Sequence, residues 1–525
     1  MKATSILAER ERIVFRTEGI APGTSVTLTE RAPLAGAEGR ILSEHMLTAA
    51  DCLLAVSRFD GRHDRLYSEF TLAAEGAVLE GPRFVTDFAE DVPENRLPYP
   101  QPACFKALYG TDEDIVDLGL KQSMCNINLP AIMTTQPAAD DIPYEHDGKT
   151  YYFIRSKIEF FDEAISRASK HGMLVTMILL NSPCMFDSTK EKALLDRCLH
   201  PGYDWNCPNA FISAFNMRTE EGQGFYRAFV EFLAERYTRE DKKYGQVAGA
   251  VISNEINSQY VWGNAGEMTV EDYTKEYLWA MRQAWLCGKK HCAHFRVYLS
   301  LDQHWHGSVH NPHFPLRYYQ GRRVVDCLAA HEKDSGEFPW HIAYHPYPED
   351  LNWPDFWHDR APNFTFSTPK ITFKNMEVLE AYLSQPQLLY RGEPRRIIFS
   401  EQGFNSQNGP MKELTEQMGE AGYVLAYMKA RNMKTVDLFM HHAYVDNPRE
   451  FGLNLGIRRY DENAPRHAGE KKPIWYAVAD MDTEREPARV EKARAYIGEF
   501  LFDFLLNPPI IYGERDRSKD GEFGG

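Results

Sequence analysis

Hydrophobic and polar positions follow two different rhythms along the chain, and the rhythm changes near residue 100. In the first part, short runs rich in β-branched residues alternate with turn-forming Gly, Pro and Asp, with no helical period between them. These runs are RIVFRTEG, TSVTLTE, CLLAVSRFD, LYSEFTLAA and RFVTDF. The pattern predicts an antiparallel β-sandwich domain over residues 1–92, followed by a proline-rich linker over 93–103.

Beyond the linker, apolar runs of strand length alternate with segments whose apolar residues recur every three to four positions. This alternation is typical of parallel strands joined by helical crossovers. The helical segments include 156–172, 224–241, 270–290 and 411–432. The predicted strands are 104–110, 121–129, 173–181, 247–255, 295–303, 340–347, 396–404 and 436–444. The chain is therefore predicted to be an α/β protein, with a (β/α)8 TIM barrel over 104–510 and an N-terminal antiparallel β-sandwich. The polar, glycine-rich segment 511–525 is expected to be disordered.

The net charge and the composition argue against some classes of binding partner. The formal net charge of −16 argues against binding to nucleic acid or to an anionic membrane surface. The N-terminal stretch lacks the apolar run of a signal peptide, and no later run reaches the roughly 18 apolar residues of a membrane helix. The cysteines lack paired spacing, which indicates reduced thiols. We expect a cytoplasmic protein with no nucleic-acid or membrane partner.

Two glutamates close predicted strands of the barrel. Glu255, preceded by Asn254, ends the fourth strand, and Glu401 ends the seventh. These strand ends lie at the barrel mouth, nearly opposite each other, so the two carboxylates can face one another across a cleft. A single glutamate at such a place is more often a capping or salt-bridged residue, but a pair suits glycoside cleavage, which uses one protonated and one ionised carboxyl group. A separation of about 5 to 5.5 Å would indicate a retaining mechanism.

On these residues the sequence resembles the clan of retaining glycosidases with (β/α)8 barrels, often called clan A, in which Asn-Glu ends strand four and a second Glu ends strand seven. The match covers roughly residues 104–505. The stretches DLGLKQSMCNINL, KKYGQVAGAVISNEINSQYVWGNAGEM and IIFSEQGFNSQ look like a bacterial family of barrel proteins related to that clan, of unassigned substrate. The resemblance implies that Glu255 is the general acid/base, that Glu401 is the nucleophile, and that Asn254 binds the sugar 2-hydroxyl.

Other strand ends supply candidate contacts to a sugar. Only one parity of residues along each strand can point into the barrel. The resemblance implies a Tyr or His near the nucleophile from strand six, which Tyr347 can provide, and a Trp after strand eight, which this chain lacks. His442 or Tyr444 would replace that Trp, or Trp262 or Trp305 would supply the platform. The candidate substrate-binding residues are Asn254, Asn126, Asn128, Asn181, Trp262, His304, Trp305, His345, Tyr347, His442 and Tyr444.

The stretch DQHWHGSVHNPH, residues 302–313, is the alternative source of chemistry, because clustered histidines can ligate a metal. It has no companion motif, and no nucleotide-binding motif lies in a strand-to-helix context. We therefore predict no metal and no cofactor, and leave two alternatives open: a metal-dependent hydrolase that uses these histidines, and a non-catalytic carbohydrate-binding barrel protein.

Taken together, the patterns predict a retaining glycoside hydrolase. It would cleave an equatorial glycosidic bond, of the β-D or α-L type, in an oligosaccharide substrate by a two-carboxylate double displacement. The sequence leaves homo-oligomerisation, the sugar and the linkage open.

Overall fold

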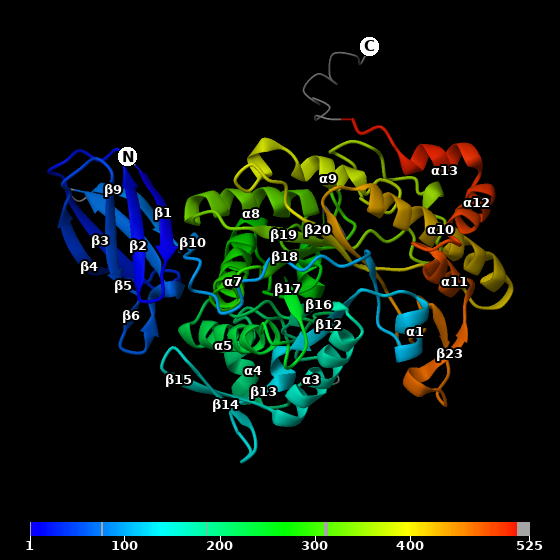
Figure 1. Cartoon of the computed structure of the whole chain (residues 1–525), viewed down its shortest axis with the longest axis horizontal. Coiled ribbons are helices and arrows are strands. Elements are labelled where there is room, and N and C mark those ends of the chain that lie inside the picture. The colour runs from blue at the N-terminus through cyan, green and yellow to red at the C-terminus, as the bar shows by residue number, and fades with distance from the viewer. Residues whose placement is uncertain (1, 75–76, 186, 309–312, 512–525) are drawn as a thin grey trace, which may run out of the picture.

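The computed structural model describes residues 2–74, 77–185, 187–308 and 313–511, and Figure 1 shows a β-sandwich at one end of a larger barrel. Helices surround the barrel strands, and the last helices of the chain lie at the end opposite the sandwich. The tail that was expected to be disordered lies, from residue 512 on, outside the described residues.

Eight parallel strands close into a barrel in the order of the chain. They are β11 (Lys106–Ala107), β12 (Gln122–Asn128), β16 (Leu174–Leu180), β17 (Val247–Ile252), β18 (Arg296–Leu301), β19 (Trp340–Tyr344), β20 (Ile397–Gln402) and β21 (Val436–His441). Each lies inside a predicted strand range, which confirms the (β/α)8 barrel. The first strand has only two residues, because its pairing is limited to Lys106 and Ala107.

The interior of the barrel is a packed core. All six residues of β17 are buried, as expected for a strand covered on both faces. One inward residue from most strands joins a compact apolar cluster: Ala107, Met124, Val251, Tyr298, Ala343, Ile398, Leu438 and Met440. Because this cluster fills the barrel, a ligand can be held only at its mouth.

The helices follow the predicted periodicity. The long ones are α3 (Arg155–Lys170), α5 (Glu220–Tyr237), α7 (Val270–His291), α8 (Gly321–Ser335) and α10 (Lys412–Asn432). Threonine side chains cap α5 and α7: Thr219 accepts from the N–H of Gly222, and Thr269 accepts from that of Asp272. The C-terminal helices α11 (Pro473–Asp480) and α12 (Glu486–Ile497) pack against α10.

The N-terminal sandwich has two four-stranded sheets, β10-β1-β2-β5 and β4-β3-β8-β9. Their strands are β1 (Lys2–Ala8), β2 (Arg12–Glu18), β3 (Ser25–Arg31), β4 (Arg40–Met46), β5 (Cys52–Ser57), β8 (Glu69–Ala74), β9 (Ala77–Arg83) and β10 (Asp87–Phe88). The predicted sandwich is confirmed, with one parallel pair, β1 and β10. β1, β4 and β9 were not among the predicted runs. Neither β4 nor β9 has a fully buried residue to mark a clear alternation, whereas β1 was missed although Ile6 and Ala8 are buried.

A buried polar network ties the sandwich to the barrel. Glu231 on α5 accepts a hydrogen bond from the hydroxyl of Tyr67 in the sandwich domain. The same carboxylate lies 2.7 Å from Nζ of Lys290 and 3.0 Å from Nδ1 of His146. Because removing one partner of such a buried network leaves the others uncompensated, these contacts fix the sandwich against the barrel.

Two further features concern the chain as a whole. None of the helices in the described ranges combines the length and the apolar character that a membrane span requires. All nine cysteines fall within those ranges and are free thiols.

Candidate active site

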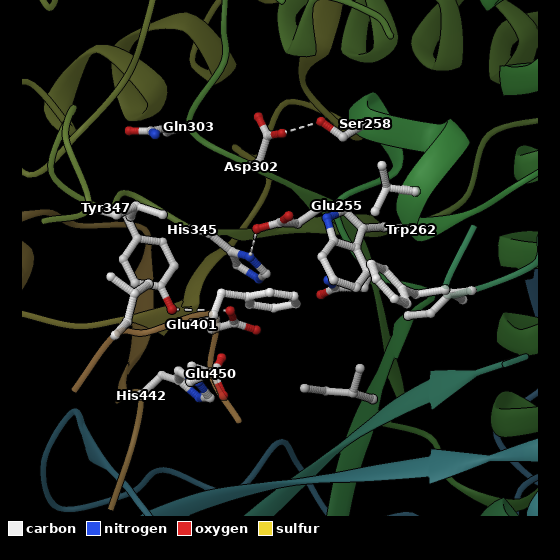
Figure 2. A pocket seen from close by; sticks show the side chains of 18 of the residues that line it. Glu255, Ser258, Trp262, Asp302, Gln303, His345, Tyr347, Glu401, His442 and Glu450 are labelled. Carbon is white, nitrogen blue, oxygen red and sulfur yellow. Dashed lines mark hydrogen bonds and ion pairs between the residues drawn. The ribbon is translucent and has the colours of Figure 1, made fainter. Parts of the chain in front are cut away.

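The strand ends of the barrel open into a cavity of about 730 Å³, shown in Figure 2. Side chains reach it from strands β12, β16 and β20 and from the loops that follow β16, β17, β18, β19 and β21. Most of the predicted site residues line it: Asn126, Asn254, Glu255, Trp262, His304, His345, Tyr347, Glu401 and His442. This mouth of the barrel is therefore the candidate active site.

Glu255 is turned into the cavity by a sharp bend just after β17. The strand ends at Ile252, and both Ser253 (φ 63°) and Glu255 (φ 38°) adopt the left-handed conformation. The backbone N–H of Glu255 donates to Oγ of Ser300 on β18, at 2.9 Å, which holds the bend in place. Left-handed non-glycine residues cost of order 1 kcal/mol or more and cluster at functional sites.

Glu255 and Glu401 face each other with His345 between them (Figure 2). One carboxylate oxygen of each glutamate and one ring nitrogen of His345 all lie within 4.8 Å of one another. Nδ1 of His345 is 2.7 Å from Oε1 of Glu255, and its Nε2 is 3.1 Å from Oγ of Ser400. The hydroxyl of Tyr347 donates to Oε1 of Glu401 at 3.1 Å. The two carboxyl groups are thus close enough to act on the same atom of a ligand.

Burial and the neighbouring carboxylates set the protonation of Glu255 and His345. It raises the pKa of Glu255, and the negative charges of Asp302 and Glu401 add to the effect, which outweighs the hydrogen bond from His345. Burial opposes a charge on His345, but the carboxylates of Glu401 and Glu255 outweigh it and raise the pKa of that imidazole. Glu255 and His345 therefore hold a proton between them, in contact with the cavity.

Asp302 is the third acidic group of the cavity, and it stays ionised. Its carboxylate accepts hydrogen bonds from Nδ2 of Asn257 at 2.6 Å and from Oγ of Ser258 at 2.5 Å. Nδ1 of His304 lies 3.0 Å away. Although burial disfavours the charge, His304 and Ser258 hold the pKa of Asp302 at about 2. A permanent negative charge thus lines the cavity near the end of β18.

A fourth carboxylate, Glu450, comes from the loop after β21. Its Oε1 lies 3.2 Å from Nε2 of His442, and its Oε2 accepts from Nδ2 of Asn447 at 2.8 Å. The hydrogen bond from His442 lowers the pKa of Glu450 against the effect of burial. Glu450 was not among the predicted site residues, because no local motif marks it and only the path of this loop brings it to the cavity.

Aromatic rings form part of the cavity lining, and Figure 2 shows one of them, Trp262, near Glu255. Trp262 stacks on Phe211, with ring centroids 5.4 Å apart and planes inclined by 30°. Phe451 lies 6.3 Å from Phe211 and is 76% exposed. The three rings come from different segments of the chain, and the two phenylalanines were not among the predicted contact residues. Trp262 as a sugar platform stays a prediction.

The remaining predicted contact residues do not line this cavity. Nδ2 of Asn128 donates to the carbonyl of Ser182, and Nδ2 of Asn181 donates to that of Cys198. The buried Trp305 donates its Nε1–H to the carbonyl of Phe366. Tyr444 donates its hydroxyl to Asp114. Their polar groups hold long loops in place, so Asn128, Asn181, Trp305 and Tyr444 drop out of the candidate site.

The same side chains indicate whether the cavity is suited to hold a metal ion. Within the described residues, the group of His, Cys, Asp and Glu that could hold a metal is Glu255, His345 and Glu401. It contains none of the histidines of residues 302–313: His304 pairs with Asp302, and residue 310 lies outside the described ranges. Both ring nitrogens of His345 already have hydrogen-bond partners. The arrangement therefore favours a proton-sharing pair over a metal ligand.

The chain matches a protein-family model and is similar, at low identity, to solved structures. The model of a family of unknown function, DUF5722, matches residues 98–502. No curated protein matches the chain. Among solved structures, the chain is similar to a family 39 glycoside hydrolase from the gut symbiont Bacteroides cellulosilyticus WH2, at 16% identity and a TM-score of 0.44, over 91% of this chain and 81% of that chain.

Two further solved structures are similar at low identity. One is a family 1 β-glucosidase from Thermotoga maritima, at 11% identity and a TM-score of 0.42, over 70% of this chain and 84% of that chain. The other is a β-glucuronidase from Bacteroides uniformis, at 11% identity and a TM-score of 0.37, over 91% of this chain and 49% of that chain. Function is therefore inferred from the side chains of the cavity itself.

Proposed function

This chain belongs to DUF5722, a family of unknown function, and we propose that it is a retaining glycoside hydrolase that cleaves an equatorial glycosidic bond in an oligosaccharide. The observation that carries the proposal is the close approach of Glu255 and Glu401, whose nearest carboxylate oxygens lie within 4.8 Å of each other. Retaining glycosidases keep the two carboxyl groups about 5 to 5.5 Å apart, whereas inverting enzymes need about 6.5 to 9.5 Å to admit a water. The spacing supports a double displacement.

In the first step, Glu401 attacks the anomeric carbon while Glu255 gives its proton to the departing glycosidic oxygen. The raised pKa of Glu255 keeps that proton available at higher pH than in an ordinary glutamate. The hydroxyl of Tyr347, which donates to Glu401, fixes the direction of the attacking carboxylate. The products are the released alcohol and a glycosyl ester of Glu401.

In the second step, water replaces Glu401. Glu255, now ionised, takes a proton from the water as the oxygen attacks the anomeric carbon, and Glu401 leaves as a carboxylate. His345 holds Glu255 by the 2.7 Å contact in both steps, and its other nitrogen is fixed by Ser400. The ring of Trp262, near Glu255 in Figure 2, suits the leaving group, because the acid must stand beside the oxygen that departs.

The test is hydrolysis of a panel of aryl β-D- and α-L-glycosides by the purified protein, with the anomer of the first product followed by NMR. We expect turnover of at least one sugar, with release of the anomer that has the configuration of the substrate. Release of the opposite anomer would refute the retaining mechanism. Absence of turnover across the panel, with oligosaccharides included, would count against hydrolysis. A chelator is expected to leave the rate unchanged. Loss of activity on addition of the chelator would favour the metal-dependent alternative.

Asp302→Asn is expected to move the basic limb of the pH profile of kcat/KM to lower pH. Activity falls as pH rises through the pKa of Glu255, because the ionised form cannot donate a proton. After burial, the negative charge of Asp302 is one of the causes that raise this pKa. Removing that charge stabilises ionised Glu255, so its pKa falls and activity is lost at lower pH.

The control for this pH profile is Asp503→Asn, which removes an equal charge from an exposed site on α13 (Glu499–Leu506). It is expected to leave both limbs in place. A basic limb that stays fixed in Asp302→Asn, or moves to higher pH, would show that Asp302 does not act on Glu255.

A further inference from the structure

More acidic than basic side chains line the cavity. None of the described residues that line it is a lysine or an arginine. Its ionisable carboxylates and imidazoles are Glu255, Asp302, Glu401, Glu450, His304, His345 and His442. Among the described lining residues, the groups that could present a positive charge to a ligand are therefore the three imidazoles.

Each of these imidazoles already has a carboxylate of its own. Nδ1 of His304 lies 3.0 Å from Asp302, and Nδ1 of His345 lies 2.7 Å from Glu255. Nε2 of His442 lies 3.2 Å from Glu450. A proton on any of the three would serve to balance its partner, so the described part of the lining leaves no cation over for a charged ligand.

Glu401 lies near His345 but is the carboxylate that forms no hydrogen bond with a described imidazole, and its hydrogen-bond partner is the neutral hydroxyl of Tyr347. The pairing thus leaves the cavity with a surplus of negative charge. An anionic group on the sugar would meet this surplus without a counter-ion. Juxtaposed like charges of this kind repel each other and weaken binding in a partly dehydrated site.

Glu450 determines whether a positive charge is available to a ligand at the end of the cavity formed by the loop after β21. Without it, His442 would be the one imidazole free to bind an anionic group. Asn447 holds the second oxygen of Glu450, so the carboxylate is fixed toward His442 by two hydrogen bonds. A neutral hydroxyl or an ammonium group can still approach, because the fixed carboxylate accepts hydrogen bonds from both.

From this pairing we infer that the cavity takes a sugar without an anionic group, either neutral or carrying an ammonium group, and that Glu450 excludes uronic, sulfated and phosphorylated sugars by occupying His442. The inference rests on the proposed function, since it names the substrate class of the same site. It also makes Glu450 a specificity-determining residue that the chemistry of the two catalytic carboxylates does not require.

The experiment compares aryl glycosides that differ only in a hydroxymethyl or a carboxylate at the sugar C6: glucoside with glucuronide, and galactoside with galacturonide. For the pair that the wild type hydrolyses, kcat/KM for the uronide is expected to be at least about 100-fold lower. Glu450→Gln is expected to narrow this gap at least about tenfold, because it removes one negative charge and frees Nε2 of His442. Glu413→Gln, at an exposed site in the first turn of α10, is the matched control and is expected to leave the gap unchanged.

Hydrolysis of the uronide as fast as its neutral counterpart would overturn the inference, and so would a gap that Glu450→Gln leaves unchanged. If the wild type hydrolyses no sugar, the proposed function fails, and calorimetry then decides the inference alone. The probes are two piperidine iminosugars that carry either a hydroxymethyl or a carboxylate group. Binding of the first, with at least about 100-fold weaker binding of the second, would support the inference. Equal binding of both, or binding of neither, would overturn it.

Discussion

Glu401→Gly is expected to lower kcat for aryl glycosides on the order of 10⁴-fold or more, because it removes the nucleophile without leaving another group within reach of the anomeric carbon. The hydroxyl of Tyr347, which contacts Glu401, is a poor substitute, since burial raises its pKa well above the ordinary value. The kinetics of wild type and variant on the same substrate measure the loss.

Azide turns this loss into a test of mechanism. Glycine leaves a space where the carboxylate stood, and a small anion can occupy it. We expect azide to restore part of the turnover on substrates with good leaving groups, and to yield a glycosyl azide whose anomeric configuration is opposite to that of the substrate. Glu462→Gly, at an exposed turn remote from the cavity, is the control for general damage. Unimpaired hydrolysis by Glu401→Gly would remove Glu401 from the chemistry.

Glu255→Gln is expected to produce a loss that depends on the leaving group. The proton from Glu255 matters most when the departing oxygen is basic, so unactivated glycosides should lose about 10²- to 10⁴-fold in kcat/KM. A 2,4-dinitrophenyl glycoside, which needs no proton to leave, should lose far less in the first step. The same variant thus supplies its own control, and the measurement is kcat/KM against the pKa of the leaving group.

The pH profile gives a second check on Glu255. In the wild type, activity should fall on the basic side as Glu255 loses its proton at its raised pKa. In Glu255→Gln the amide does not titrate, so this limb should disappear. Equal losses for good and poor leaving groups, or a basic limb that survives the substitution, would assign the proton to another residue.

The barrel and its active face were accessible from the sequence because burial of a strand on both faces leaves a continuous apolar run. All eight predicted strand ranges contain a barrel strand. The apolar pattern did not reveal β1 of the sandwich, nor β4 and β9, where side chains are exposed or half-buried. It also could not separate Asn126, which lines the cavity, from Asn128, which holds the backbone of Ser182.

The sequence by itself determined the two-domain architecture and the strand ends that bring Glu255 and Glu401 to one barrel mouth, because the apolar runs and their order along the chain are local properties. Tertiary structure alone decided the rest: the 2.7 Å contact of His345 with Glu255, and the arrival of Phe451 and Glu450 from the loop after β21. Those contacts depend on the paths of long loops, which are set by many weak, non-local interactions. The pairing of charges in the cavity follows from these loop paths, and no residue pattern along the chain predicts it.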